Sequence, residues 1–354
     1  MMTTMFELGS ELQSLIKKAC KGKNHIKLTI GCVLDGEKTI KVFDENGEIQ
    51  NENYVYEIAS ITKTFTASLL AKYIHENKIS LNDSIRKCFV GLDANKYYPT
   101  FRRLATHTAG YSAQLPFSWY DYLKTPFVGY PQLVTVERLK HILEKKQLED
   151  RDYKWVYSNY GFTLLGYAVG EIFGKGYWNA MDDFLSNELG LTSSYTGTFP
   201  EKNLHGFNKR NKDCGNYVFD KSPNKPSGEG DISATAEDLL TYAQMNMHEE
   251  KPYFALCHKK HATAQSMLAS LLVKSMGVDE VDMGLGWMLY RRNNRIIWHS
   301  GDSDSFSSYL GFDKDKKVAV TVLSNYKMNT TNIGVSILAH LSNNESTSEG
   351  NRPA

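Results

Sequence analysis

The residues best placed to do chemistry in this sequence are a serine and a lysine three positions apart, Ser60 and Lys63. Apolar residues recur four apart over residues 60–76, which predicts a helix with Ser60 at its N-cap. On one face of a helix the hydroxyl and the amine can share a proton, and the positive helix N-terminus favours an alkoxide-like nucleophile. The pair therefore predicts nucleophilic catalysis by Ser60.

The Ser-x-x-Lys pattern by itself is not specific, because it begins at four other serines. These serines are Ser14, Ser84, Ser222 and Ser324. Ser60 differs from them because it follows a strand-like segment, residues 54–58, and begins a long amphipathic helix. We therefore place the nucleophile at Ser60.

A second reactive group, Tyr157 with Asn159, comes just before a helix predicted to begin at Gly161. A phenol beside a lysine can carry a proton, and an asparagine can bond both the lysine and a substrate carbonyl. The same spacing begins at Tyr177, but within a helical pattern where aromatic rings are typical of packing. We expect Tyr157 in the site. The sequence leaves open whether Lys63 or Tyr157 takes the serine proton.

The third group is His299, Ser300 and Gly301, at the end of an apolar strand. A cation-capable ring, a hydroxyl and a glycine there allow a substrate backbone to lie along the strand edge. Glycine permits close approach, so the amide of Asp302 is predicted to join that of Ser60 in an oxyanion hole. Taken alone, His299 is equally typical of a hydrogen-bonded histidine at a strand end.

The elements that must position these groups are strands near both ends of the chain and helices between them. Asp35-Gly36 and Asn46-Gly47 predict tight turns between early strands. The predicted late strands cover residues 283–290, 295–299, 307–312 and 318–323. This order predicts an α+β fold in which both ends of the chain build one antiparallel sheet.

We divide the chain accordingly into two domains. Residues 1–80 and 271–342 form an α/β domain, and residues 81–270 form an inserted, mostly helical domain. The polar tail, residues 343–354, is expected to be disordered.

The three motifs, in this order, resemble those of the class C β-lactamases and of the penicillin-recognising DD-peptidases and esterases related to them. Flanking segments agree, including LATHTAGY at 104–111 and GEGDISATAEDLLTYAQMN at 228–246. The resemblance covers about residues 54–323. It implies a β-lactamase/transpeptidase-like fold, with an antiparallel sheet flanked by helices, a helical domain, and an active site in the cleft between them.

The resemblance also implies roles for individual residues. Ser60 is the nucleophile, with Lys63 and Tyr157 as the proton-handling pair. Asn159 orients these groups, and His299 with Ser300 holds the substrate.

Two departures bear on the substrate. Histidine stands at 299 where class C β-lactamases usually have lysine, and a mostly neutral ring holds a carboxylate less strongly. In this respect the chain resembles DD-peptidases, esterases and D-amino-acid peptidases. Asp302 and Asp304 either form an acidic rim, which would favour neutral esters or peptides with a free amino end, or point to solvent.

Composition bounds the partners. The chain carries 41 basic and 40 acidic side chains, so no overall field favours nucleic acid, and no stretch is apolar enough to span a membrane. We expect a small-molecule or peptide substrate, a monomer, and no cofactor or metal.

His258 and His261 lack an acidic partner at ligand spacing and are expected to be solvated. The five cysteines show no pairing pattern and suit a cytoplasmic location, or an extracytoplasmic one if a signal peptide has been removed.

These observations predict a serine hydrolase that acts on amide or ester bonds through an acyl-Ser60 intermediate. β-Lactams, D-Ala-type peptides and small esters are candidate acyl donors, and transfer of the acyl group to an amine stays open beside hydrolysis. The alternative is a penicillin-recognising binding or sensor module that is acylated with little or no turnover.

Overall fold

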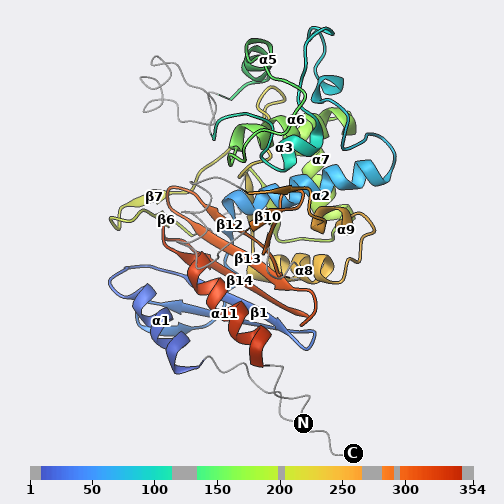
Figure 1. Ribbon diagram of the computed structural model, residues 1–354. Coiled ribbons are helices and arrows are strands. Elements are labelled where there is room, and N and C mark those ends of the chain that lie inside the picture. The colour runs from blue at the N-terminus through green and yellow to red at the C-terminus, as the bar shows by residue number, and fades with distance from the viewer. Residues whose placement is uncertain (1–8, 114–133, 198–203, 265–280, 291–295, 345–354) are drawn as a thin grey trace, which may run out of the picture.

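The computed structural model describes residues 9–113, 134–197, 204–264, 281–290 and 296–344. Its largest element is an antiparallel sheet with the strand order β3-β2-β1-β14-β13-β12-β11-β10-β9. The strands are β1 (Leu28–Leu34), β2 (Glu37–Asp44), β3 (Gly47–Ile49), β9 (Ala262–Thr263), β10 (Val281–Met283), β11 (Met288–Tyr290), β12 (Ile296–Asp302), β13 (Ser307–Asp313) and β14 (Val318–Ser324). The pairing of β1 with β14 joins the two ends of the sequence, as predicted (Figure 1).

Helices surround this sheet and form the region above it in Figure 1. They are α1 (Ser10–Cys20), α2 (Thr62–His75), α3 (Phe101–Ala105), α5 (Val136–Lys145), α6 (Asn159–Phe173), α7 (Gly176–Asp183), α8 (Ala236–Met247), α9 (Phe254–His258) and α11 (Thr330–Asn344). Short 3-10 turns cover Ala59–Ile61 and Ile85–Cys88, and a π-helical turn covers Phe184–Glu188. Small sheets join β4 (Tyr56–Glu57), β8 (Ile232–Ala234) and β5 (Ser194–Thr196), and β6 (Gly206–Phe207) with β7 (Asp213–Gly215).

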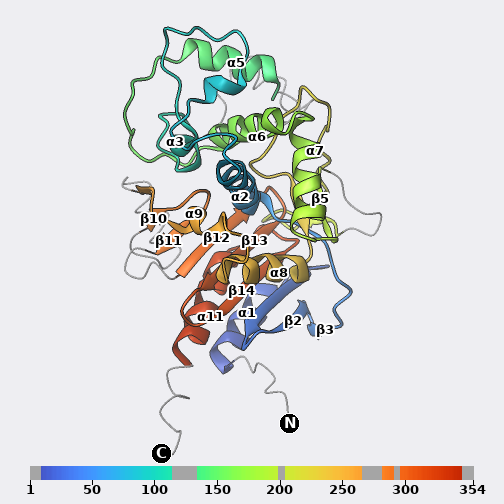
Figure 2. The ribbon, with the colours of Figure 1, turned by 90° about the vertical axis from the view of Figure 1, so that its right-hand side faces the viewer.

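The central strands are covered on both faces because their residues alternate between two apolar clusters. On β14, Val318 and Val320 pack with α1 and α11, whereas Ala319 and Leu323 pack with α8 and the helical region. Figure 2 shows α11 and α8 on opposite sides of β14. This double covering makes the sheet a rigid platform for β12, the strand that carries the third motif.

Helix α2 lies between the sheet and the helices α3, α5 and α6. All its residues from Thr62 to Ala71 are buried. Its threonines lower the intrinsic helix propensity, so packing on all sides stabilises it. The helix that begins next to Ser60 is therefore fixed at the centre of the molecule.

Three details of the sequence predictions are wrong. The strand predicted over residues 283–290 is two strands, β10 and β11, because a turn closed by the Gly284 N–H and the Trp287 carbonyl, 2.9 Å, separates them. Helix α6 begins at Asn159, two residues before the predicted start. Residues 343 and 344, assigned to a disordered tail, complete α11, and the rest of that tail lies outside the described residues.

The division into domains stays a prediction. Helix α8 and strand β9 precede residue 271, and yet α8 packs on the sheet and β9 belongs to it.

Candidate active site

Ser60 lies in the 3-10 turn between β4 and α2, and it is partly exposed. The expectation that it caps α2 is wrong, because α2 begins at Thr62 with Ile61 as its N-cap. The residue before the serine, Ala59, has a φ of 45°, a left-handed conformation that is strained for a residue with a side chain. The strained turn holds the Ser60 side chain at the N-terminal end of the helix, close to the positive end of its dipole.

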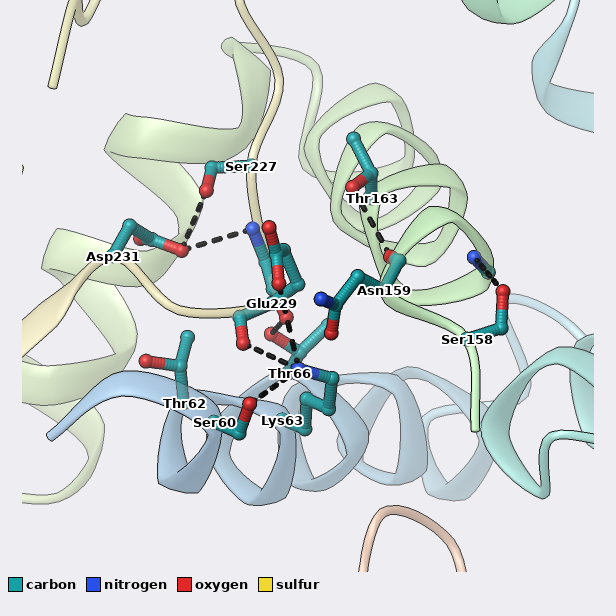
Figure 3. A network of polar contacts seen from close by, with 12 residues as sticks. Ser60, Thr62, Lys63, Thr66, Ser158, Asn159, Thr163, Ser227, Glu229 and Asp231 are labelled. Carbon is teal, nitrogen blue, oxygen red and sulfur yellow. Dashed lines mark hydrogen bonds and ion pairs between the residues drawn. The ribbon is translucent and has the colours of Figure 1, made fainter. Parts of the chain in front are cut away.

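Lys63 lies in the first turn of α2 and is fully buried. Its Nζ donates to Ser60 Oγ at 2.9 Å and to the main-chain carbonyl of Glu229 at 2.6 Å. The Glu229 carboxylate is a third neighbour, with Oε2 3.5 Å from Nζ. Three oxygen neighbours suit an ammonium group that donates three hydrogen bonds. Figure 3 shows Ser60 and Glu229 directed at the lysine from two separate segments.

The second motif approaches Lys63 from α6. The Lys63 Nζ lies 5.1 Å from the centroid of the Tyr157 ring, within the range of a cation–π contact. Ser158 caps α6 by accepting from the Gly161 N–H at 3.0 Å, and Figure 3 shows Asn159 extending from the start of that helix toward Lys63. Both predicted residues of the motif therefore lie beside the Ser60–Lys63 pair.

The third motif reaches the site along β12. A methyl group added at Gly301 would lie 2.1 Å from the Ile58 carbonyl oxygen and 2.9 Å from the Ser60 backbone nitrogen. Only glycine allows the strand to come this close to Ser60, as predicted. This approach brings the backbone of β12 close to the Ser60 amide. That the Ser60 and Asp302 amides form an oxyanion hole stays a prediction.

His299 is buried beside this group, with its ring centroid 6.2 Å from that of Tyr157. Its Nδ1 lies 2.7 Å from the Ser300 carbonyl, so Nδ1 carries the proton and donates it there. Nε2 is then a buried acceptor with no hydrogen-bond partner among the described residues. Burial, with a smaller effect from the Lys63 charge, lowers the His299 pKa to about 3. At neutral pH the ring is therefore uncharged, and its Nε2 has a lone pair that can accept a hydrogen bond.

The side chain of Asp302 lies outside the buried group, with 54% exposure. Its carboxylate accepts from Ser307 Oγ at 2.5 Å and lies 3.4 Å from Lys327 Nζ. Asp304 lines a surface hollow of about 290 Å³ together with Lys327 and two further cationic residues, Lys209 and Arg210. Cationic side chains neighbour both aspartates. The negative charge of Asp302 and Asp304 alone is therefore a weak basis for the prediction that the site rejects anionic substrates.

Sequence analysis assigned no role to two residues of the site. Glu229 was given none because its segment shows no recognised spacing with Lys63. His107, in the segment 104–111, is a lone histidine whose position no local pattern reveals. It accepts from the Ser158 N–H through Nδ1 at 3.0 Å, and its ring lies 4.5 Å from that of Tyr157.

His107 is buried and neutral. Burial, followed by the charges of Lys63 and His299, lowers its pKa well below the usual value. With Nδ1 accepting, Nε2 carries a proton, and this atom has no partner within the described segments. His107 thus fixes the residue that follows Tyr157 without adding a charge beside Lys63.

Residues of two other Ser-x-x-Lys pairs are engaged elsewhere. Ser84 Oγ donates to the Tyr98 carbonyl at 3.1 Å, and Lys87 pairs with Asp83 at 2.7 Å. Lys327 pairs with Asp302, as above. Ser60, in contrast, accepts a hydrogen bond from the lysine of its own motif.

The remaining chemical candidates are structural. The expectation that His258 is solvated is wrong, because the ring is buried between Asn246 and Glu249, with nitrogen–oxygen distances of 3.2 and 3.3 Å. His261 Nε2 bonds the Leu256 carbonyl at 2.9 Å. Over the described ranges there is no cluster of three or more acidic, histidine or cysteine side chains arranged to hold a metal ion. Nor do those ranges contain a helix with the length and apolarity needed to cross a bilayer.

Comparison with protein families and curated sequences agrees with this geometry. The family described as Beta-lactamase matches residues 32–334. A protein named Beta-lactamase from Pseudomonas fluorescens is 25% identical over 318 residues, covering 77% of this chain and 80% of its own length. D-Alanyl-D-alanine-carboxypeptidase/endopeptidase AmpH of Escherichia coli is 23% identical over 316 residues, covering 82% and 77%. Protein flp of Staphylococcus aureus is 22% identical over 76% of this chain, which spans about half (52%) of that protein.

Solved structures share the fold. The β-lactamase/D-alanine carboxypeptidase from Pseudomonas syringae superposes with a TM-score of 0.72 at 17% identity, covering 97% of this chain and 98% of its own. The penicillin-binding protein homologue from Pyrococcus abyssi gives a TM-score of 0.70 at 21% identity, covering 93% and 76%. The latter is described as octameric, so a monomer stays a prediction for the present chain.

Proposed function

This chain belongs to the Beta-lactamase family and is a serine hydrolase, and from that premise we propose that it cleaves amide or ester bonds through an acyl intermediate on Ser60. The observation that carries the proposal is the 2.9 Å contact between Lys63 Nζ and Ser60 Oγ at the start of a buried helix. A nucleophile needs a neighbouring group that relays its proton, and Lys63 is in hydrogen-bond contact with it.

The acylation step uses groups on three sides of Ser60. When the pair formed by Lys63 and Tyr157 holds one proton fewer than an ammonium plus a phenol, it accepts the Ser60 hydroxyl proton as Oγ bonds the acyl carbon, and it then returns that proton to the leaving group. The backbone amides of Ser60 and Asp302 stabilise the developing oxyanion. Asn159 and His299 hold the substrate on either side of the reacting bond. Lys63 Nζ lies 5.1 Å from the centre of the Tyr157 ring, so the two groups are close together, and we assign the proton transfer to the pair and not to one member.

We further propose that the enzyme prefers acyl donors whose group in contact with His299 is uncharged or is a hydrogen-bond donor. The buried Nε2 of His299 is an acceptor without a partner among the described residues, and the ring bears no charge at neutral pH. An N–H or O–H group of a small ester or D-Ala-type peptide satisfies this atom, whereas a carboxylate there would face another acceptor. The names of the relatives, a β-lactamase and a D-alanyl-D-alanine-carboxypeptidase/endopeptidase, support β-lactams and D-Ala-type peptides as acyl donors and do not bear on the preference for neutral groups at His299.

The test is time-resolved intact-mass spectrometry with p-nitrophenyl acetate and, separately, a penicillin. We expect an acyl adduct on the native protein that forms and then decays as product accumulates, and no adduct on Ser60→Ala. An adduct that forms and persists with both reagents would favour the sensor alternative. Equal behaviour of native and mutant would refute the nucleophile assignment.

Substrate preference has its own comparison. A neutral p-nitrophenyl ester and its analogue carrying a terminal carboxylate are compared on the native enzyme and on His299→Lys. We expect the native enzyme to prefer the neutral ester and the lysine variant to shift the ratio toward the anionic ester by about tenfold, the effect of about 1.4 kcal/mol. A native preference for the anionic ester would contradict the assignment to His299.

A further inference from the structure

A carboxylate lies beside the catalytic lysine. Glu229 Oε2 is 3.5 Å from Lys63 Nζ, and Lys63 Nζ is 2.9 Å from Ser60 Oγ. Lys63 is fully buried, whereas the Glu229 side chain is 23% exposed. The carboxylate is therefore more exposed than the lysine it contacts, and the two distances place it within about two hydrogen-bond lengths of Ser60 Oγ. Figure 3 shows Glu229 and Ser60 beside Lys63.

The turn that carries Glu229 is fixed at several points. Buried Asp231 accepts from Ser227 Oγ at 2.8 Å and from the Gly228 N–H at 2.9 Å, which closes the turn around residue 229. Thr66 of α2 donates to the Gly228 carbonyl at 2.8 Å. The turn also packs directly on α6, where a methyl group at residue 228 would lie 2.9 Å from the Gly166 Cα.

These contacts fix the backbone of Glu229 relative to the nucleophile. Lys63, which contacts Ser60, and Thr66, which bonds the turn, both lie on helix α2. The same helix therefore positions the turn and the nucleophile. A catalytic group has to be held by such a supporting shell. The fixed turn also presents the Glu229 carbonyl to Lys63, so Lys63 has a hydrogen-bond partner in this segment besides the carboxylate.

We propose that Glu229 is the general base of deacylation, a role that rests on the acyl-Ser60 mechanism proposed above. Once Ser60 is acylated, a water molecule entering from the solvent side meets the carboxylate next to the acyl carbon. Glu229 removes a proton from this water as the water oxygen bonds the acyl carbon. The bond between that carbon and Ser60 Oγ then breaks.

The protons balance over the cycle. Lys63 donates a proton to the departing Ser60 Oγ and is reprotonated by Glu229, whose carboxyl lies beside it. The acid product keeps the water oxygen, and the enzyme returns to its starting state with one water consumed. No metal, cofactor or further reactant takes part in this step.

The competing role for Glu229 is to neutralise the charge of Lys63 and do nothing else. The two roles differ in which half-reaction depends on the carboxylate. A base for water acts only after acylation, whereas a charge partner of Lys63 affects acylation and deacylation alike, because Lys63 handles the proton in both.

The experiment measures acylation and deacylation separately, by stopped-flow release of p-nitrophenol and by the decay of the acyl adduct in intact-mass spectra. We expect Glu229→Gln to slow deacylation by about 10²- to 10⁴-fold, the usual contribution of a general base, while acylation changes by less than about fivefold. Glu229→Asp, which keeps the carboxylate on a shorter side chain, is expected to retain part of the deacylation rate.

Glu188→Gln is the matched control, because Glu188 is a similarly exposed glutamate (26%) paired with Lys72 and Lys251 away from the site. Its rates should equal those of the native enzyme, and its melting temperature shows what the loss of such an ion pair does to stability. If Glu229→Gln deacylates like the native enzyme, or if both steps slow in parallel, the proposal is overturned. If the native enzyme forms no adduct on Ser60, the proposed function fails and this role fails with it.

Discussion

Replacing Gly301 with alanine tests whether the close approach of β12 to Ser60 is needed for catalysis. The added methyl would lie 2.1 Å from the Ile58 carbonyl oxygen and 2.5 Å from Ser308 Oγ, whereas ordinary contact begins near 3.4 Å. The strand must therefore retreat by about 1 Å from the Ser60 turn. A misplacement of about 1 Å in a catalytic geometry can cost about 10²-fold in rate. We expect kcat/KM for p-nitrophenyl acetate to fall by about that factor.

Gly230 provides a control on the other side of the same turn. A methyl group there would lie 3.8 Å from Ala59, an ordinary contact, so Gly230→Ala should keep kcat/KM within about threefold. The assay is the initial rate of p-nitrophenol release by both variants and the native enzyme, with melting curves to confirm folding. If Gly301→Ala matches Gly230→Ala in rate, the strand does not need to approach the nucleophile and the predicted oxyanion hole loses its structural basis.

Three further variants test neighbouring groups. Lys63→Met should lower the acylation rate by about 10²- to 10⁴-fold, and a loss below tenfold in stopped-flow assays would show that another group takes the serine proton. Burial lowers the pKa of His299 in the native state to about 3, below the usual 6.5. Between these two pH values the unfolded chain binds a proton that the native state does not. The free energy of unfolding therefore falls as the pH drops from 6.5 toward 3. The native protein should therefore lose more unfolding free energy between pH 7 and pH 4.5 than the His299→Gln variant does, by about 3 kcal/mol. Urea titration at the two pH values measures this difference. An equal loss in both proteins would contradict the burial of a neutral ring. Asp302→Asn should leave kcat/KM within about threefold, because the side chain is exposed and its pair with Lys327 is a surface ion pair; a loss near 100-fold would assign the side chain a role.

The sequence predicted the sheet and the three motifs because their signals are local. The turns at Asp35-Gly36 and Asn46-Gly47 connect β1 to β2 and β2 to β3, as the turn chemistry indicated. Gly301 was expected to permit close approach, and the contact with Ile58 confirms it. Each of these features depends on residues near one another in the sequence or on a conformation that one residue type favours.

The predictions that failed depend on contacts between distant segments. Ser60 was expected to cap a helix, but the pairing of β4 with β8 and the approach of β12 leave it in a tighter turn before the helix begins. Glu229 meets Lys63 only because a turn 166 positions away packs against α2. His107 reaches the backbone of Ser158 across 51 positions. No spacing rule within one segment identifies such residues.

The most direct test of the account is to find which residue carries the acyl group. The native protein is trapped with a penicillin or p-nitrophenyl acetate, digested, and sequenced by tandem mass spectrometry. The account predicts the added mass on Ser60 alone, and none on the Ser60→Ala protein. An adduct on another serine, such as Ser84, or turnover that survives in Ser60→Ala, would contradict the account.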